Sequence, residues 1–229
     1  IAESHYGVII GDAFSTVIEN CTNKAPVILD ECLANGLATR LDVGGIVGRT
    51  DSDSQIIGCT NEGTIESKST CNFGLTAEDA VPKATVYMGG ICGYCRCSII
   101  DCSNTGDITS NYNAYEKATA GIVARIINAD NTVKNCTNSG NIIDNSARTP
   151  EDSDISKLDY NREIYVSGVS AIQASSTIEN CSNSGSITLG TNVKIVYVGG
   201  VVGKTNHPLT VLSNLTFSGQ INSWAGLRY

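Results

Sequence analysis

The sequence predicts an all-β fold, a right-handed parallel β-helix of about six coils with three short strands in each coil. The first observation behind this prediction is a two-part repeat that recurs from one end of the chain to the other. The second is that apolar residues alternate with period two in each copy, as they do in strands. The third is composition: 23 Gly and only 4 Pro among 229 residues suit short strands joined by tight turns. We expect residues 1–229 to form a single domain.

The first part of the repeat is a glycine pair followed by Ile or Val. Apolar residues alternate ahead of it, as in Leu41/Val43 and Val86/Met88, which indicates a strand with one buried face. The second glycine recurs in all six copies, if Gly7 is counted as a degenerate one, and would let the chain turn a corner. Copies of this part occupy residues 6–9, 43–48, 88–93, 119–124, 166–171 and 198–203.

The second part of the repeat reads apolar-x-x-Cys-Thr/Ser-Asn-x-Gly-x-Ile. We expect one strand to carry its first apolar residue and the Cys, and another to carry the Gly-x-Ile. Almost all length variation falls between this part and the next glycine pair, so a variable loop is expected at one corner of each coil. A βαβ arrangement is rejected because no copy contains a ten-residue helical period. Copies of this part occupy residues 18–27, 56–65, 99–108, 133–142, 178–187 and 212–221.

Two columns of the repeat are interpreted as framework. The Cys column ends in Leu215, and a thiol that Leu can replace is best explained as a small buried apolar side chain. The Asn column ends in Phe217, and inward Asn side chains can bond to the backbone and to the next coil, which predicts a ladder. The Cys column is Cys21, Cys59, Cys102, Cys136 and Cys181, and the Asn column is Asn23, Asn61, Asn104, Asn138 and Asn183.

Cysteine and acidic clusters predict neither a metal site nor a cofactor. In the run from Cys92 to Cys102, the two end residues occupy regular positions of the repeat. Only Cys95 and Cys97 remain as possible zinc ligands, and two ligands do not make a zinc site. The acidic stretches 51–53 and 151–154 lack the spaced ligands and Gly turn of a calcium loop. Two further thiols, Cys32 and Cys71, fall at nearly equivalent places in successive loops; they are predicted to be free, with a disulfide as the alternative.

A column of tyrosines is the candidate ligand-binding site. Tyr87, Tyr165 and Tyr197 stand three residues before the second glycine, where period two places them outward. Tyr112, Tyr115 and Tyr160, in the adjoining loops, would join them on the same side. Exposed rings can stack on sugars or anchor a protein partner. The alternative interpretation is that aromatic residues simply favour strands.

The glycine-pair segments at 44–48 and 199–203, with the Asn-Cys-Thr/Ser-Asn-x-Gly units, resemble GLUG-type repeats of bacterial surface proteins. The resemblance covers nearly the whole chain. It implies an extracellular, non-catalytic repeat module, secreted or on the cell surface, and it transfers no active site. Because the chain begins at Ile1 without a signal peptide, we expect a fragment of a larger surface protein.

Two classes of function remain open at this stage. The favoured one is a structural or adhesive module, not an enzyme, whose loops and exposed strand face bind a host glycan or a host or bacterial surface protein. The alternative is a polysaccharide lyase or glycoside hydrolase, which needs carboxylates on one face of neighbouring coils. The outward column at the tyrosines offers one carboxylate, Asp42. The net charge of −8 argues against nucleic acid, and no apolar run is long enough to insert into a membrane.

Overall fold

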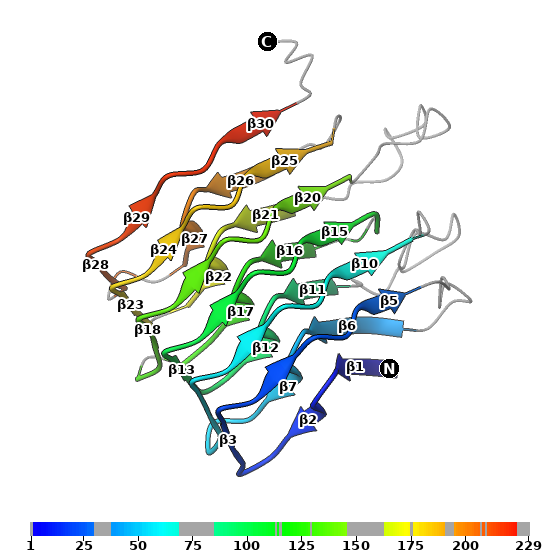
Figure 1. Cartoon of the computed structure of the whole chain (residues 1–229), viewed down its shortest axis with the longest axis vertical. Coiled ribbons are helices and arrows are strands. Elements are labelled where there is room, and N and C mark those ends of the chain that lie inside the picture. Colours follow the sequence, from blue (N-terminus) through cyan, green and yellow to red (C-terminus); the bar gives the residue numbers. More distant parts are fainter. Residues whose placement is uncertain are drawn as a thin grey trace.

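In a computed structural model, the chain is a stack of six coils built from five parallel six-stranded sheets (Figure 1). The structure describes residues 2–29, 38–68, 85–112, 114, 116–128, 130–145, 163–174, 176–190, 195–206, 208 and 210–223. These residues form strands and turns and include no helix, so none that could cross a membrane. The predicted parallel β-helix of about six coils is confirmed.

Each coil contributes one strand to each of the sheets, which we call A to E in chain order. Sheet A contains β1 (Ala2–Gly7), β6 (Ala38–Gly44), β11 (Thr85–Gly89), β16 (Glu116–Ala120), β21 (Glu163–Ser167) and β26 (Ile195–Gly199). Sheet B contains β2 (Ile10–Ala13), β7 (Val47–Thr50), β12 (Cys92–Cys95), β17 (Val123–Ile126), β22 (Ser170–Gln173) and β27 (Val202–Thr205). Sheet C contains β3 (Val17–Glu19), β8 (Gln55–Ile57), β13 (Ser98–Ile100), β18 (Thr132–Lys134), β23 (Thr177–Glu179) and β28 (Val211–Ser213). Sheet D contains β4 (Thr22–Asn23), β9 (Thr60–Asn61), β14 (Ser103–Asn104), β19 (Thr137–Asn138), β24 (Ser182–Asn183) and β29 (Thr216–Phe217). Sheet E contains β5 (Val27–Leu29), β10 (Ile65–Ser67), β15 (Ile108–Ser110), β20 (Ile142–Asp144), β25 (Ile187–Leu189) and β30 (Ile221–Ser223).

The prediction of three strands per coil is wrong, because each coil has five. Sheets C and D are separated by two residues, the first of which is in the left-handed region, for example Asn20 at φ 53° and Asn135 at φ 54°. This corner breaks a segment that reads as one strand. Sheets A and B are separated at the glycine pair, where the chain turns between Gly44 and Val47. Two-residue corners of this kind leave the apolar spacing almost unchanged, so periodicity does not show them.

The strand register aligns the repeat copies residue by residue. Val43 pairs with Met88, Ile65 with Ile108, and Asn104 with Asn138. In the first coil Gly7 pairs with Gly44, so Val8 occupies the position of the second glycine. The second glycine is therefore present in five coils, and the prediction that all six carry it is wrong.

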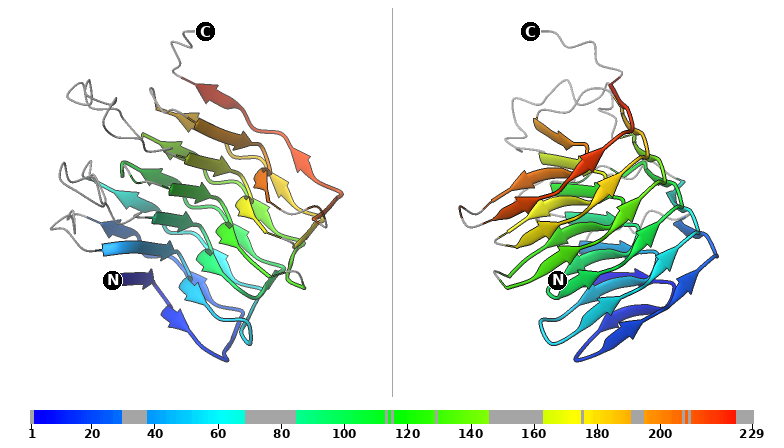
Figure 2. Two further views of the ribbon diagram at one scale, coloured as in Figure 1. Left: turned by 180° about the vertical axis from the view of Figure 1, so that it is seen from behind. Right: turned by 60° about the vertical axis from the view of Figure 1, so that its left-hand side comes forward.

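The longest and most variable connections run from sheet E to the sheet A strand of the next coil. The connection from β10 to β11 spans residues 68–84, and the one from β20 to β21 spans residues 145–162. Figure 2 shows the stack from behind and from the side, with the sheet E strands ending and the sheet A strands beginning along one edge. The predicted loop corner is confirmed, because the sheet E and sheet A strands that bound the connections all lie along that edge.

Two apolar regions fill the coil interior. One lies between sheets B, C and D and includes Ile46, Val47, Ile56 and the buried Cys column. The other lies between sheets A and E, where Val43 and Met88 pack near Ile65 and Ile108. Most of these side chains are completely buried, so the interior is the main source of hydrophobic stabilisation.

The Asn column forms the predicted ladder. The Nδ2 group of Asn61 donates to Oδ1 of Asn104 over 2.7 Å, and Asn104 donates in the same way to Asn138 over 2.7 Å. Each amide also donates within its own coil; that of Asn104 reaches the Gly106 carbonyl at 2.9 Å. A Cβ atom added to Gly121 would lie 2.3 Å from Cγ of Asn138. The second glycine is thus needed to make room for the ladder.

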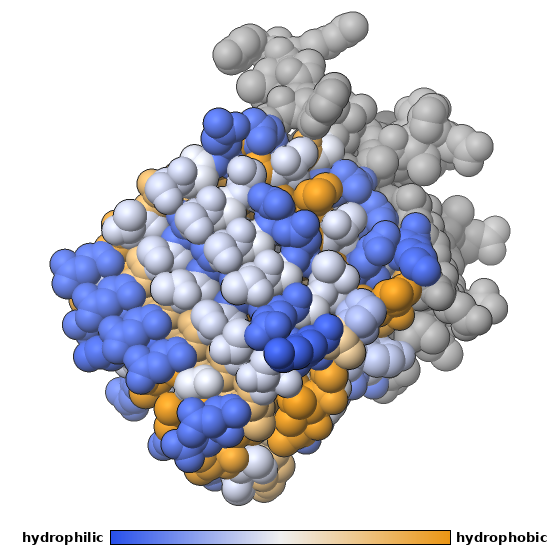
Figure 3. Space-filling view, in the orientation of Figure 1, coloured by the Kyte–Doolittle hydropathy of each residue, from blue (hydrophilic) through white to orange (hydrophobic). Residues whose placement is uncertain are grey.

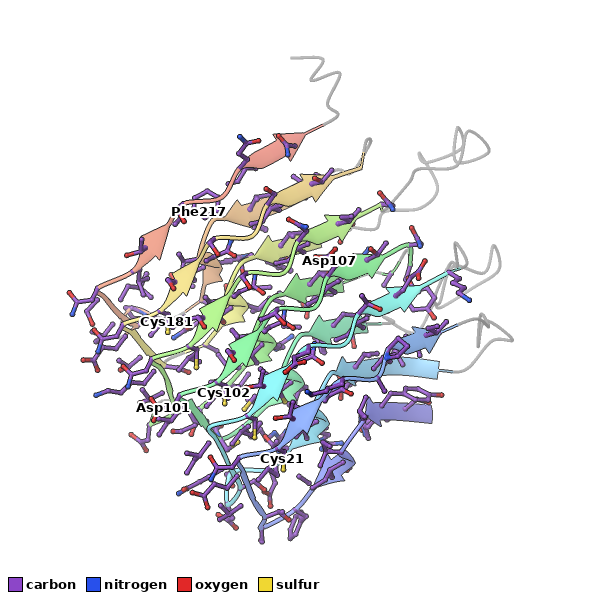
Figure 4. All side chains as sticks on the ribbon, in the orientation of Figure 1. Cys21, Asp101, Cys102, Asp107, Cys181 and Phe217 are labelled. Carbon is purple, nitrogen blue, oxygen red and sulfur yellow. The ribbon has the colours of Figure 1, made fainter. Side chains whose placement is uncertain are left out.

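The Cys column is buried packing, as predicted, and Figure 4 shows Cys21, Cys102 and Cys181 along one line of the stack. All eight described cysteines are free thiols, and Cys95 and Cys97 join the same core with their sulfurs 3.5 Å apart. Burial raises the pKa of Cys95 well above its ordinary value. The loop pair Cys32 and Cys71 lies outside the described residues.

The ladder generates the first testable prediction. Substituting Asn104→Ala should lower the free energy of unfolding by about 2–4 kcal/mol, because buried groups in two coils lose their hydrogen-bond partners. Denaturant titration measures the change. The exposed neighbour in sheet D provides the control, and Thr137→Ala should change stability by no more than about 0.5 kcal/mol. Equal effects from the two substitutions would show that the ladder contributes little.

The buried thiols generate the second prediction. In the native protein Cys59, Cys102 and Cys136 should resist a thiol reagent, whereas the half-buried Cys21 should react sooner and all should react after denaturation. Cys102→Ala should cost about 1–3 kcal/mol and Cys102→Val less, since Val refills most of the cavity. Rapid native labelling of the three column residues, followed by mass spectrometry, is the result that would rule out this packing.

Candidate functional site

The tyrosine column does not form the exposed platform that the sequence predicts. Tyr87 and Tyr165 are each only 2% exposed, and Tyr197 is half-buried. Of the loop candidates, Tyr112 is buried in the apolar region between sheets A and E, and Tyr115 and Tyr160 lie outside the described residues. Alternation correctly places the column on the face of sheet A that points away from Val43 and Met88. The prediction of exposure is wrong because sheet B covers that face.

Sheet B folds against this face of sheet A. Gly48, Gly93 and Ala124 lie at the close approach, and a Cβ on Gly48 would come within 2.7 Å of the Tyr6 nitrogen. The rings of Tyr87 and Tyr94 consequently meet with centroids 5.8 Å apart. We call this further, smaller apolar region the A–B seam; it comprises Tyr87, Tyr94, Ala118, Ala120, Ala124, Tyr165, Ala171 and Ile172, with Ile127 and Tyr197 partly buried against it.

Ion pairs border the seam in the first two coils. The carboxylate of Asp42 is completely buried, and its Oδ1 accepts a hydrogen bond from Nε of Arg40 at 2.9 Å. The two side chains also form an ion pair, with Nη2 of Arg40 2.7 Å from Oδ2 of Asp42. His5 approaches the same carboxylate, with Nδ1 2.9 Å from Oδ2. Burial opposes the charge of Arg40, but the hydrogen bond and charge of Asp42 raise its pKa. The Arg40 guanidinium also lies 3.5 Å from the ring centre of Tyr94.

A second polar group borders the seam in the third and fourth coils. Arg125 donates to Oε1 of Glu116 at 2.5 Å and to the Tyr87 hydroxyl at 2.6 Å. The same hydroxyl donates to Glu116. Burial and then the nearby Glu116 charge raise the pKa of Tyr87, so the phenol remains protonated.

In the last two coils, charged side chains border the seam in a similar way. The rings of Tyr165 and Tyr197 stack with centroids 5.1 Å apart and an interplanar angle of 9°. Lys204 lies over the Tyr197 ring at 4.2 Å from its centre and 3.7 Å from Glu163. The Tyr165 hydroxyl donates to Glu163. Tyr87 and Tyr165 thus join sheet A to sheet B, and their hydroxyl groups already donate to Glu116 and Glu163.

The opposite side of the molecule carries a flat polar surface, which we call the D–E face. It consists of the outward side chains of sheets D and E and of the turns between them. Figure 3 shows it as a pale band over these strands, bordered by strongly hydrophilic residues at the corner with sheet C. Its central residues are Thr60, Glu62, Thr64, Ser103, Thr105, Asp107, Thr137, Ser139, Asn141, Ser182, Ser184 and Ser186.

Hydrogen bonds between coils hold the D–E face in place. The hydroxyls of Thr60 and Ser103 lie 3.1 Å apart, and Asp107 accepts from the Asn141 backbone nitrogen at 2.7 Å. The Asn141 side chain in turn accepts from the Ser186 nitrogen at 3.1 Å. Neighbouring coils repeat at about 4.8 Å, so the face presents hydroxyl and amide groups at regular spacing.

Sequence reasoning did not single out the D–E face as a site. The signal was available, because the Asn column is flanked by Thr or Ser at nearly every copy. Ser103 and Thr105 surround Asn104, and Thr137 and Ser139 surround Asn138. Because Asn104 points inward, its two neighbours must point outward.

Among the described residues, no group of three or more His, Cys, Asp or Glu side chains is placed to hold a metal ion. The carboxylates that border the A–B seam instead contact Arg, Lys, His or Tyr. The chemistry that these residues offer is therefore hydrogen bonding and ion pairing within the fold.

Comparison with family models gives one match, to the GLUG motif over residues 40–66. Residues 40–66 are a GLUG motif. The matched segment begins in β6 and ends in β10, so the GLUG motif corresponds to one complete coil through all five sheets. Strand pairing places the equivalent residues of the other coils beside it, consistent with a GLUG-type repeat protein. No curated protein and no solved structure gives a significant match.

The buried ion pair within this GLUG coil generates the third prediction. Arg40→Thr should lower the free energy of unfolding by about 3 kcal/mol, because Asp42 keeps a buried charge without its principal partner. The double variant Arg40→Thr/Asp42→Tyr installs the residues of the next coil, Thr85 and Tyr87, and should recover most of that loss. Denaturant titration of both variants distinguishes these outcomes. A double variant less stable than the single one would contradict this account of the pair.

Proposed function

We propose that the chain is a non-catalytic repeat module of a secreted or cell-surface protein, structural and adhesive, that binds a host glycan through its D–E face. The observation that carries the proposal is the face itself: a flat array of exposed hydroxyl and amide groups on a framework held by the Asn ladder. Polar groups fixed before binding lose little entropy when they bond to a ligand. A polysaccharide offers complementary hydroxyl groups along its length.

The arrangement of the carboxylates favours binding over catalysis. A glycoside hydrolase or lyase needs acidic groups free to contact the glycosidic bond or a substrate proton. Asp42 is buried against Arg40, Glu116 contacts Arg125, and Glu163 contacts Lys204 and Tyr165. Breaking these contacts to accept a substrate would cost part of the stability of the A–B seam.

The position of the variable connections also supports a display role. The most variable of them leave from sheet E and return to sheet A, so their lengths change without altering the five strands of the coil. Because these connections can change in length and sequence without changing the core, such a module can vary the loops that it displays.

A glycan array, with a parallel assay for cleavage of acidic polysaccharides, tests the proposal. We expect binding to one or more glycans without cleavage. The triple variant Thr105→Lys/Ser139→Lys/Ser184→Lys should reduce that binding at least tenfold, because long charged side chains would hold a flat ligand away from the D–E face. All three positions are exposed, so the melting temperature should change little.

A matched control places the same three charges on sheet C. Gln55→Lys/Thr132→Lys/Thr177→Lys changes the net charge equally and lies on a different outward face. This control should bind like the unmodified chain. Loss of binding in both triple variants would assign the effect to net charge, and cleavage of any glycan would overturn the non-catalytic assignment.

A further inference from the structure

A lysine and an aspartate face each other inside the fourth coil. Lys117 of β16 and Asp144 of β20 are 0% and 1% exposed, and the ammonium nitrogen lies 3.0 Å from each carboxylate oxygen. Lys117 stands where the neighbouring coils have Val86 and Ile164. The fold itself thus accepts an apolar residue at this position, and replacing such a buried ion pair by apolar residues is often neutral or stabilising.

The surroundings hold both side chains in one geometry. The Lys117 nitrogen donates to the carbonyl oxygens of Tyr112 at 2.9 Å and Ser110 at 3.3 Å. The Thr119 hydroxyl donates to Oδ2 of Asp144 at 3.3 Å. Burial lowers the pKa of Lys117, although the charge of Asp144 opposes this shift. The lower pKa makes the neutral amine, which is the nucleophilic form, easier to form.

We propose that Lys117 and Asp144 are the precursors of an intramolecular isopeptide bond that closes the fourth coil. Nothing in the coil repeat requires either residue, and the two reacting groups are held in contact within a dry interior. An amine and a carboxyl group fixed in contact react with a very high effective concentration.

The reaction needs no oxidant or cofactor. Transfer of a proton from the ammonium group to Oδ1 converts the ion pair into a neutral amine and a carboxylic acid. The amine nitrogen attacks Cγ of Asp144, and the Thr119 hydroxyl is placed to stabilise the charge that develops on Oδ2. A C–N bond forms, the C–Oδ1 bond breaks, and Oδ1 leaves as water with its own proton and a second proton from the amine.

The bond would turn one coil into a covalent ring. Residues 117 and 144 lie in sheets A and E, and the chain between them passes through sheets B, C and D. The ring would therefore enclose the fourth rungs of the Asn and Cys columns. Force applied along the chain would pass through the bond and not unwind this coil, which suits a module under tension.

Intact-mass spectrometry of the full chain, unfolded after incubation at neutral pH, tests the proposal. The expected mass is lower than the sequence mass by one water. Trypsin should then yield residues 97–125, uncut after Lys117, joined to residues 135–148 as one branched peptide. A full sequence mass, with a separate peptide ending at Lys117, would overturn the proposal.

The variant Lys117→Met separates this bond from other losses of water. It removes the nucleophile and keeps an unbranched apolar side chain of similar length, so its mass should equal its sequence mass. A loss of water that persists in Lys117→Met would place the dehydration elsewhere and refute the assignment. Neither measurement depends on glycan binding, so this proposal can fail or hold independently of the proposed function.

Discussion

The side-chain ladder of asparagines is the interaction on which the rest of the structure depends. Each amide ties its own coil to the next, from Asn23 to Asn183, where the last amide donates to the Gly200 carbonyl at 2.9 Å. A buried amide without partners would cost free energy, so the ladder requires every coil to keep the same register. The glycine column leaves room for the ladder in the second to fifth coils, whereas in the sixth coil Gly200 faces Phe217, which replaces Asn and ends the ladder. Because the register is fixed, the outward Thr and Ser residues beside each Asn are aligned into the D–E face.

The two faces of the molecule use polar residues in different ways. Around the A–B seam, charged groups contact one another and the tyrosine rings, so their role is to join sheet B to sheet A. On the D–E face the polar groups are small, exposed and held by bonds between coils, which leaves them available to a ligand. This contrast is why we propose adhesion for the D–E face and a structural role for the tyrosines.

Much of the fold could be predicted from the sequence because the same repeat pattern occurs six times along the chain. The Asn ladder and the buried Cys column both follow from residues that recur at one position and from the apolar replacement in the last copy. The five sheets could not be predicted, since the left-handed corner at Asn20 changes φ without changing the apolar spacing. The burial of Tyr87 was missed because alternation gives the side of a strand but not what packs on it. Lys117 and Asp144 lie beside a connection of variable length, and only the strand register shows that Lys117 occupies an apolar column.

Side-chain amide hydrogen exchange, followed by NMR, tests the central role of the ladder most directly. The NH₂ groups of Asn61, Asn104 and Asn138 are buried and donate at both hydrogens, within the coil and to the next. They should exchange as slowly as backbone amides of the central strands, whereas the exposed Asn135 and Asn141 should exchange rapidly. Rapid exchange of the three ladder amides in the folded protein would contradict the account, because the coils would then be held together without them.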